Sequence, residues 1–446
     1  MNKKIFLFLL FIILIKIPII LKTDLSPDEC YYFLWSKNLD ISYYDHPPMV
    51  AYLIKISTEI FGENEIGVRF FAIFLSFLTG IFLILIGKKL KDYDTSLNIL
   101  LLIAPSILFS IGSIIMTPDT PLIFFLILSY YFLLKFKENK NFIYLSAIFF
   151  GLSLLSKYTA ILILPSFIYF FYKEKIILKK EGILFLFITF FLFSPVILWN
   201  FKNDFLSFKF QLSHGIPAAK LNIINTFNYL RDMILVLSFP LSILIFYYSF
   251  KGFLKEKLNF LTISSFFPLI FFLFTSFKFR PEANWPCISY VFLIILSSIY
   301  IKRNKIFWIF FLISFIINIL IHIHAISPFI KFKNDPIYRI KGWEEIAKEV
   351  DRIRKEKNIK NVAANTYQIA SILSFYLPQK EFVPSLNINS RRNQFDLWKD
   401  RFFNLNEEFL FVGKINEGIL RSFSKVEKVK EIRIYNKTLF VYIMKK

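Results

Sequence analysis

The 446-residue sequence is poor in cysteine, histidine and acidic residues. Its two cysteines, Cys30 and Cys287, exclude a disulfide framework and a CxxC metal site. Both fall in segments predicted to be loops on the same face, so a single bridge between them is one interpretation. Two unrelated buried thiols are the commoner arrangement, and this is what we expect.

Acidic residues are outnumbered by basic ones, with 32 Asp and Glu against 54 Lys and Arg, which gives a net charge of +22. In a soluble protein this balance would indicate binding to nucleic acid. Here the basic residues fall largely in short stretches between apolar runs, which is the charge pattern of a membrane protein. The sequence therefore predicts no nucleic-acid partner.

Apolar residues make up 56% of the chain and the mean hydropathy is +0.55, as is typical of multi-spanning membrane proteins. Residues 1–22 begin like a signal peptide, but no small-residue cleavage site follows and the stretch is long enough to span a bilayer. We therefore expect a retained first helix. Further apolar segments lie at about 67–87, 95–116, 119–134, 142–172, 182–199, 226–250, 259–277, 285–301 and 306–326.

Clusters of Lys and Arg between these segments indicate which ends face the cytoplasm. All the clusters and the N-terminus fit on one side only if 142–172 is a hairpin of two helices. At about 1.5 Å per residue a single helix there would also be too long for the bilayer. This predicts about eleven transmembrane helices. The clusters are Lys88, Lys89 and Lys91; Lys135, Lys137 and Lys140; Lys173, Lys175, Lys179 and Lys180; Lys251, Lys255 and Lys257; and Lys302, Arg303 and Lys305.

The sequence pattern changes at about residue 327. Residues 342–358 have the periodicity of an amphipathic helix, and NVAAN, EFLFVG, KEIRIYN and TLFVYIM alternate like short strands. An odd number of spans places the end of the chain outside, so we predict that 327–446 form a small soluble α/β domain on the periplasmic or outer face. Residues 1–326 then form an α-helical polytopic membrane domain, whose first outer loop is 23–66.

This first outer loop contains a long polar stretch that starts at Ser26. Ser26, Pro27 and Glu29 fit the N-cap, the first position and the capping box of a helix, which is a structural explanation for them. An exposed acid beside a membrane face is also what a transferase needs to remove a proton from an acceptor hydroxyl. Asp28 is therefore the candidate catalytic base.

The second half of the loop, residues 43–48, ends in two prolines that can open a helix. A helix start has free N–H groups, and a histidine directly before it can bind a phosphate. His46 is therefore a candidate for contact with a phosphate or a metal. The alternatives are a capping residue or a partner of Asp45.

Further charged residues border the same predicted face. Asp119 lies in a tight turn, where it either forms the turn or completes an acceptor or metal site. Lys157 interrupts an apolar stretch, so it either extends to the membrane surface or reaches the leaving phosphate. Arg69 and Arg280 could stabilise the charge of a departing phosphate.

Some polar and aromatic residues have a simpler explanation. Trp285 and its neighbours can stack on a sugar or anchor the chain at the membrane interface. His322 and His324 would point to different faces of a helix, so we interpret them as structural. Residues 92–94 match the DxD motif of nucleotide-sugar transferases, but they lie in a short cytoplasmic turn without room for a nucleotide-binding sheet. The candidate sugar or interface contacts are Tyr44, Asn284 and Trp285.

Several of these pieces occur in a specific order. The order begins with DE, an aromatic-rich juxtamembrane helix, YYDHPP and FGENEIGVRFFA. It continues with MTPDTPL, GLSLLSKYTA, KFRPEANWP, RIKGWEEIA and SILSFYL. The ordered set resembles the GT-C polyprenyl-phosphate-sugar glycosyltransferases, in the branch that includes protein O-mannosyltransferases and lipid A aminoarabinose transferases. The resemblance covers nearly the whole chain.

The resemblance implies roles for individual residues. It makes Asp28 the catalytic carboxylate and His46, which is a Lys in the lipid A branch, a contact to the carrier phosphate. Asp45 takes the place of an acid that helps hold a divalent metal in some relatives, which makes a divalent metal the one cofactor implied. The acceptor or metal site would comprise Glu29, Asp45 and Asp119, and the donor-phosphate site His46, Arg69, Lys157 and Arg280.

These features predict an inverting glycosyltransferase of the inner membrane. Its donor would be a sugar on a polyprenyl phosphate of the undecaprenyl type, and its acceptor a lipid A, glycan or protein hydroxyl. A transporter or flippase for lipids or sugars is the alternative, and it should show internal repeats with polar residues at the membrane midplane. No internal repeat is apparent in the sequence. A non-catalytic envelope assembly protein is a second alternative.

Overall fold

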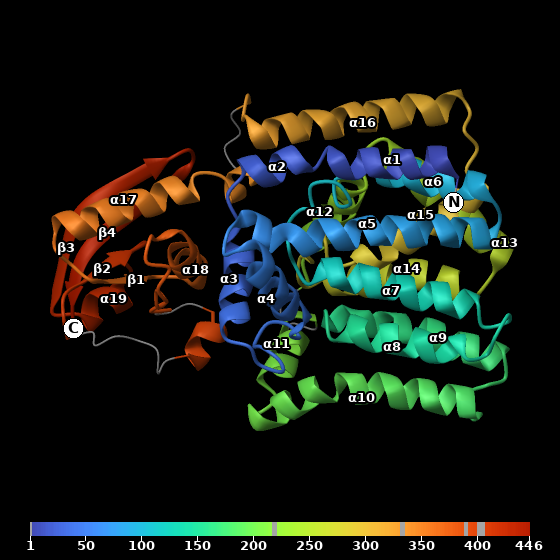
Figure 1. The fold of residues 1–446 in the computed structure, drawn as a ribbon, viewed down its shortest axis with the longest axis horizontal. Helices are drawn as coiled ribbons and strands as arrows, with labels where there is room; N and C mark the ends of the chain where they lie inside the picture. The colour runs from blue at the N-terminus through green and yellow to red at the C-terminus, as the bar shows by residue number, and fades with distance from the viewer. Residues whose placement is uncertain (1, 216–220, 331–334, 388–390, 399–405) are drawn as a thin grey trace.

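The computed structural model describes residues 2–215, 221–330, 335–387, 391–398 and 406–446. A bundle of roughly aligned apolar helices forms one part, and a small α/β domain adjoins one end of it (Figure 1). The N-terminus lies at the opposite end of the bundle from this domain. The bundle therefore has two distinct ends, and only one of them carries the C-terminal domain.

The apolar segments of the sequence form the helices of the bundle. The helices are α1 (Lys3–Leu14), α2 (Ile17–Lys22), α5 (Glu65–Leu90), α6 (Tyr93–Ile103), α7 (Asp119–Leu134), α8 (Phe142–Leu154), η1 (Tyr158–Ile163), α9 (Leu164–Lys173), α10 (Lys180–Lys202), α12 (Ile223–Val236), α13 (Leu241–Glu256), α14 (Phe260–Ser276), α15 (Cys287–Tyr300) and α16 (Lys305–Ile326). A short helix, α11 (Leu206–Gly215), follows α10.

Four stretches among the described residues are long and apolar enough to cross a membrane: Lys3–Lys22, Glu65–Leu90, Lys180–Lys202 and Lys305–Ile326. A fifth is added if the bent pair α12 and α13 is one span. The remaining apolar helices have 10–17 residues, whereas a straight span needs about 20. A multi-pass membrane protein is therefore supported, with fewer full-length spans than the eleven that the sequence predicts.

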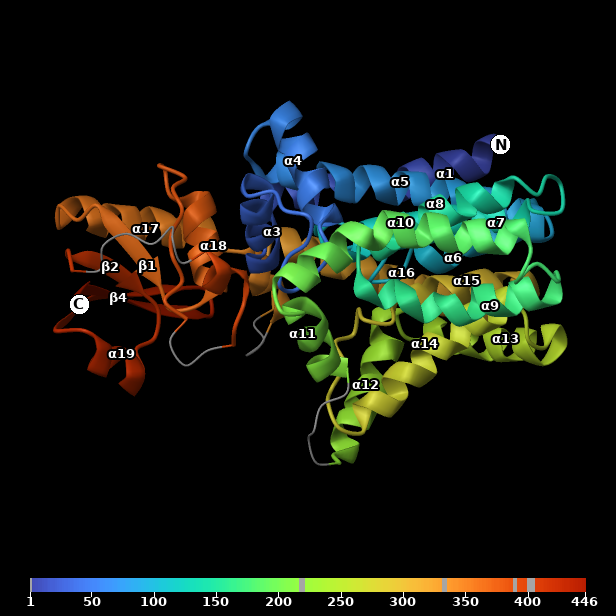
Figure 2. The same ribbon diagram turned by 90° about the horizontal axis from the view of Figure 1, so that it is seen from below.

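The predicted break in one apolar segment is confirmed, and two other segments need correction. Segment 142–172 is divided into α8 and η1–α9, as the charge pattern predicts. Segment 226–250 is not one helix, because α12 and α13 meet at an angle of 101° just before Pro240 (Figure 2). Segment 95–116 is helical only to Ile103, since Pro105 cannot continue the helix and 104–116 turn back on themselves.

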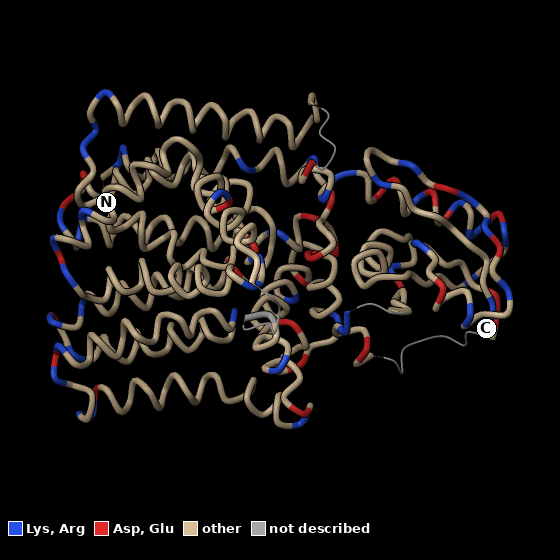
Figure 3. Tube along the Cα trace, turned by 180° about the vertical axis from the view of Figure 1, so that it is seen from behind, with Lys and Arg blue, Asp and Glu red and all other residues tan. Residues whose placement is uncertain are grey.

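Charged residues gather at the two ends of the bundle and leave its middle almost uncharged (Figure 3). The loops that carry the predicted cytoplasmic clusters lie together at the end with the N-terminus. Ion pairs join them: Lys89 with Glu138, Lys137 with Glu174, Lys140 with Glu181, and Arg303 with Asp94. The basic clusters thus share one end of the bundle, and the C-terminal domain occupies the other.

The C-terminal domain has a four-stranded sheet in the order β1-β2-β4-β3, and its four strands are those predicted from the alternating pattern. β1 pairs parallel with β2, and the other pairs are antiparallel. The predicted amphipathic helix is also present as α17. The elements are β1 (Asn361–Ala364), β2 (Phe409–Val412), β3 (Lys425–Ile434), β4 (Lys437–Lys445), α17 (Trp343–Glu356), α18 (Tyr367–Tyr376), α19 (Glu417–Ser422) and two short 3-10 helices, η2 (Pro336–Ile340) and η3 (Gln394–Leu397).

The predicted first outer loop is largely helical, with α3 (Pro27–Lys37) and α4 (Met49–Phe61) between the bundle and the C-terminal domain (Figures 1 and 2). α3 packs on α18, where the rings of Phe33 and Phe375 lie 4.9 Å apart. One apolar core runs from α3, α4 and the start of α5 into the C-terminal domain. This packing holds the polar residues of 23–66 against both parts of the protein.

The two cysteines are both buried and free, as expected. Cys30 lies in α3, within the predicted first outer loop, and Cys287 is the first residue of α15.

Candidate functional site

The start of α3 places Asp28 at the junction of the bundle and the C-terminal domain. The capping box forms as predicted, with Ser26 N donating to Glu29 Oε2 at 2.8 Å and Glu29 N donating to Ser26 Oγ at 3.2 Å. Asp28, one position earlier, keeps 36% of its side chain exposed and accepts a hydrogen bond from Arg339 Nη2 at 3.0 Å. Burial raises the pKa of the Asp28 carboxyl above its usual value, and Arg339 opposes the shift.

Glu29 and Arg69 form a buried ion pair that corrects two predictions from the sequence. Arg69 Nε and Nη2 donate to the two carboxylate oxygens of Glu29 at 2.8 and 2.9 Å. The remaining guanidinium N–H groups donate to the carbonyl and hydroxyl of Thr23 and to the carbonyl of Asp24. Since Arg69 is 1% exposed and has no free donor, it is not arranged to bind a donor phosphate.

Glu29 has an equally complete set of partners. Besides Arg69 and Ser26, its carboxylate accepts a hydrogen bond from the backbone N–H of Met116 at 3.1 Å. Glu29 is fully buried, so it is not arranged as an acceptor or metal ligand. The pair instead holds three segments together: the end of α2, the start of α3 and the segment before α7.

The Asp45 carboxylate is held by side chains from two distant parts of the chain. Tyr31 from α3 donates its hydroxyl to Asp45 Oδ2 at 2.7 Å, and Arg391 Nη1 donates to Oδ1 at 2.8 Å. The Arg391 guanidinium also lies over the rings of Phe210 and Tyr367, at 4.7 and 5.5 Å. Sequence reasoning missed Arg391, because its partner Asp45 is 346 residues away and no local motif marks it.

A second contact beside Arg391 joins the C-terminal domain to the same loop. Gln394 Oε1 accepts a hydrogen bond from the backbone N–H of Tyr44 at 2.8 Å, and Gln394 N donates to the Tyr31 hydroxyl at 2.8 Å. The Tyr44 ring packs against Phe210, 5.0 Å away. Tyr44 is thus buried beside Asp45, as part of the wall of the junction.

His46 lies just before α4, between the residues around Asp45 and those around Asp119. Its Nδ1 is buried and has no hydrogen-bond partner among the described residues. Burial lowers the pKa of the imidazole to about 3, and the positive charge of Lys157 contributes in the same direction. His46 is therefore neutral at physiological pH and has a ring nitrogen available for a ligand.

Asp119 is the centre of a buried polar cluster at the start of α7. Lys157 Nζ donates to Asp119 Oδ1 at 2.6 Å, Asn284 Nδ2 donates to Oδ2 at 2.6 Å, and Cys287 Sγ lies 3.3 Å from Oδ1. The Lys157 side chain is 7% exposed, so it does not extend to the membrane surface. It lies in the break between α8 and η1, where the chain is extended. The structure thus brings Asp119, Lys157 and Asn284 together.

Arg280 and Trp285 are not joined to this cluster by any contact that the structure describes. Arg280 Nη2 donates to Asp232 of α12 at 2.6 Å, and half of the Arg280 side chain is exposed. The Trp285 ring packs between Phe272 and Phe279, with centroids 5.9 and 5.8 Å away. Asn284, predicted to contact sugar, instead holds Asp119.

The residues present do not fit the divalent metal site implied by the resemblance. Within the described ranges, no group of three or more His, Cys, Asp or Glu side chains is arranged to hold a metal ion. Both carboxylate oxygens of Asp45 already have partners, and one of them is the cationic guanidinium of Arg391. A divalent metal ion at Asp45 would have to compete with the Arg391 guanidinium for the carboxylate.

The motifs interpreted as structural have structural contacts. Asp92 caps α6 by accepting from the backbone N–H of Thr95 at 2.7 Å. His322 Nδ1 bonds to the carbonyl of Asn318 at 2.8 Å, and His324 Nε2 bonds to Asp335 at 2.7 Å. Neither motif forms part of the site at the junction.

Comparison with solved structures identifies the fold. ArnT from Cupriavidus metallidurans in the apo state superposes with a TM-score of 0.68 and 12% sequence identity, covering 98% of this chain and 97% of that one. The same protein bound to undecaprenyl phosphate gives 0.66 and 13% over the same shares. The chain therefore has the fold of ArnT over almost its whole length. This agrees with the predicted mostly helical chain with a small C-terminal sheet.

Sequence comparison finds matches over part of the chain. The profile of the dolichyl-phosphate-mannose-protein mannosyltransferase family matches residues 45–199, which include Asp45, His46, Asp119 and Lys157. Lipid A galacturonosyltransferase RgtD from Rhizobium johnstonii is 28% identical over 151 residues, which cover 32% of this chain and 31% of that protein.

A second curated relative is an uncharacterized protein from Aquifex aeolicus. It is 33% identical over 129 residues, which cover 28% of this chain and 26% of that protein. The matched regions thus span less than a third of the length of either curated relative.

Proposed function

We propose that this protein is a membrane glycosyltransferase of the GT-C type, which moves a sugar from a polyprenyl-phosphate donor to a hydroxyl of an envelope acceptor. The observation that carries the proposal is the set of side chains at the junction of the bundle and the C-terminal domain. The junction holds a partly exposed carboxylate with a raised pKa (Asp28), a neutral imidazole with an unpartnered nitrogen (His46) and a buried cation (Lys157). The names of RgtD and of the ArnT complex with undecaprenyl phosphate support a lipid-linked donor and a sugar-transfer reaction.

The proposed membrane orientation is supported by the distribution of charge. The end of the bundle with the N-terminus and the Lys clusters would face the cytoplasm by the positive-inside rule. The junction and residues 327–446 would then lie on the periplasmic or outer face, and about eleven apolar segments would cross or enter the membrane. A lipid-linked donor could reach the junction from the side without any nucleotide.

Asp28 is suited to act as the general base. Its carboxylate would take the proton from the acceptor hydroxyl while the acceptor oxygen attacks the anomeric carbon. The bond between that carbon and the phosphate oxygen then breaks, and the polyprenyl phosphate leaves with the bonding electrons, which inverts the anomeric centre. A raised pKa makes a carboxylate a stronger base, so burial of Asp28 favours this step.

The leaving phosphate requires positive charge or hydrogen-bond donors. Lys157 and Arg391 are the cations that, with Asp119, act electrostatically on His46. A phosphate beside the His46 ring would replace the missing hydrogen-bond partner, and it would compete with Asp119 for the Lys157 ammonium. Of the phosphate ligands predicted from the sequence, the proposal keeps His46 and Lys157. Arg391 takes the role that the sequence predicted for Arg69 and Arg280.

The C-terminal domain would help to select the acceptor. Arg339, Arg391 and Gln394 all come from residues after 326, and they contact Asp28, Asp45 and Tyr44 respectively. The acceptor classes are lipid A, another envelope glycan and a protein hydroxyl. The domain therefore forms part of the wall around the proposed base and is not a separate appendage.

The experiment is a transfer assay with purified full-length protein. It is incubated with a panel of radiolabelled polyprenyl-phosphate sugars and envelope extracts, and new glycosidic products are identified. Asp28→Asn should still bind donor and lose turnover, whereas Asp94→Asn, which alters an acid at the other end of the bundle, should behave like the wild type. Movement of labelled lipid across proteoliposomes without any new glycosidic bond would instead establish a transporter.

A further inference from the structure

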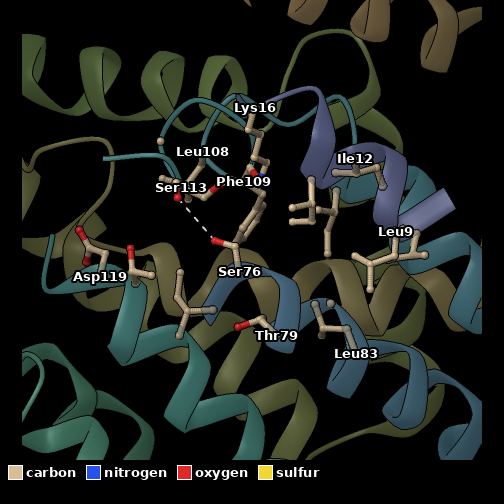
Figure 4. A pocket seen from close by; sticks show the side chains of 17 residues that line it. Leu9, Ile12, Lys16, Ser76, Thr79, Leu83, Leu108, Phe109, Ser113 and Asp119 are labelled. Atoms are coloured by element: carbon tan, nitrogen blue, oxygen red, sulfur yellow. Dashed lines mark hydrogen bonds between the residues drawn. The ribbon is translucent and has the colours of Figure 1, made fainter. Parts of the chain in front are cut away.

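A cavity of about 70 Å³ lies inside the bundle, between α1, α5, α6, α7 and the turns of 104–116 (Figure 4). Most of its wall is apolar, and it reaches Asp119 at one side. One cation is present in the wall, Lys16, from the break between α1 and α2. The proposed transfer reaction assigns no role to this cavity.

Lys16 is buried without a carboxylate partner. It is 2% exposed, and its Nζ donates to the carbonyl of Phe109 at 2.9 Å and to Ser113 Oγ at 2.6 Å. An ammonium has three N–H donors, so one remains. Among the described residues it forms no ion pair, unlike Arg69 and Lys157 in the same half of the bundle. A lone buried cation at membrane depth is costly, which makes it a candidate for a functional site.

The depth of Lys16 follows from its position in the chain. It lies six residues before the end of α2 at Lys22, so a helical rise of about 1.5 Å per residue places it about 9 Å inside the bundle end. That end is the one that carries α3 and the C-terminal domain. Lys16 is therefore within reach of a headgroup that enters from that end.

The wall of the cavity is sorted along the bundle axis. On α5 the hydroxyls of Ser76 and Thr79 precede Leu83, and α5 runs away from the C-terminal domain. α1 also runs along the bundle, towards that domain, and Leu9 of α1 comes before Lys16, which follows the end of the helix. In both segments the polar residue is nearer the junction and the apolar residue is deeper. A cavity with this gradient matches a molecule with a polar head and an apolar chain.

We propose that this cavity binds the head and first carbons of an anionic single-chain amphiphile, with a phosphate or phosphate ester at Lys16 and the chain directed towards Leu9 and Leu83. The hydroxyls of Ser76 and Ser113 face the same space and would accompany the anion (Figure 4). The site is separate from the one formed by His46 and Lys157. It does not depend on sugar transfer, although the Asp119 carboxylate borders both.

The size of the cavity sets how much of the ligand it holds. A water molecule needs about 10–15 Å³ of such space, so a cavity of about 70 Å³ takes roughly five water-sized groups. That is enough for a phosphate head with little more than the first carbons. The rest of a longer chain must leave between the helices towards the surrounding lipid.

The test uses a diazirine-bearing decyl phosphate with the full-length protein in detergent, followed by mapping of the labelled peptides. In the wild type the label should fall on α1 and α5 near Leu9 and Leu83. Lys16→Met should reduce that label at least tenfold. Ser76→Leu, which fills the cavity and keeps Lys16, should reduce it as well and serves if Lys16→Met does not fold. Lys137→Met removes an exposed lysine at the far end and is the control.

Competing ligands show how much the phosphate head and the apolar chain each contribute to binding. Decyl phosphate should displace the label, inorganic phosphate should do so only at much higher concentration, and decanol should be at least tenfold weaker than decyl phosphate. Equal competition by decanol, or undiminished labelling of Lys16→Met, would overturn the proposal. Asp28→Asn should label like the wild type even when it has no transferase activity, so the two proposals can fail independently.

Discussion

Replacing Arg69 tests whether its role is structural, as its contacts indicate, or phosphate binding, as the sequence predicts. The Arg69→Met variant keeps an apolar stem of similar length and removes the cation. Glu29 would then keep only the hydrogen bonds from the backbone N–H groups of Ser26 and Met116. Since Glu29 is fully buried, its charge would be left without a counter-ion.

The expected cost is large. Removing one partner of a buried ion pair typically destabilises a protein by about 3–5 kcal/mol, because the other charge stays desolvated. Total stabilities are commonly about 5–15 kcal/mol, so Arg69→Met should unfold at clearly milder conditions. The double variant Arg69→Met with Glu29→Gln removes both charges, so it should recover a measurable part of the loss.

Unfolding of purified protein in mixed micelles measures these stabilities, and donor KM is measured on the folded fraction. We expect a stability loss that the double variant partly reverses, with little change in donor KM. A loss below about 1 kcal/mol combined with a strongly raised donor KM would refute this reasoning. It would mean that Arg69 faces the donor after all.

Four further outcomes are expected. Asp28→Asn should lose at least about a hundredfold in turnover while donor binding, measured by filter retention, is unchanged. The pKa of His46 is lowered from 6.5 to about 3 in the fold, so the unfolded state alone takes up the proton below pH 6.5. Wild-type stability should therefore fall by about 2 kcal/mol between pH 6.5 and 5, and His46→Gln should lack that part of the fall in thermal unfolding scans. Lys157→Met should lose both stability and turnover; adding Asp119→Asn should restore stability and not turnover. Because the site does not fit a divalent metal, chelation with EDTA should leave turnover unchanged, and restoration of lost activity by a specific metal would contradict this.

Some features were predictable because they depend on neighbouring residues. The capping box of α3 needs only Ser26 and Glu29, three positions apart, and it forms as expected. The strands of the C-terminal domain follow from alternation within a few residues, and the division at Lys157 follows from charge and length. These are local or compositional signals.

Other features could not be read from local pattern. Asp28 and Glu29 are adjacent acids, yet one is partly exposed and the other is fully buried against Arg69, 40 residues later. The two arginines predicted to bind phosphate have other partners, while Arg391 reaches Asp45 from 346 residues away. Burial and long-range pairing decide these roles, and neither is visible in residue spacing.

The sequence by itself determined that this is a helical membrane protein with a small C-terminal α/β domain, because hydropathy, charge distribution and strand periodicity are properties of short segments. It also determined which side chains could do chemistry. Only the tertiary structure decided which of these side chains come into contact. The packing of α3 and α4 between the bundle and the C-terminal domain places Asp28, His46 and Arg391 at one junction, and it encloses Glu29 with Arg69. The physical reason is that the cost of burying a charge depends on partners that the fold alone brings into contact.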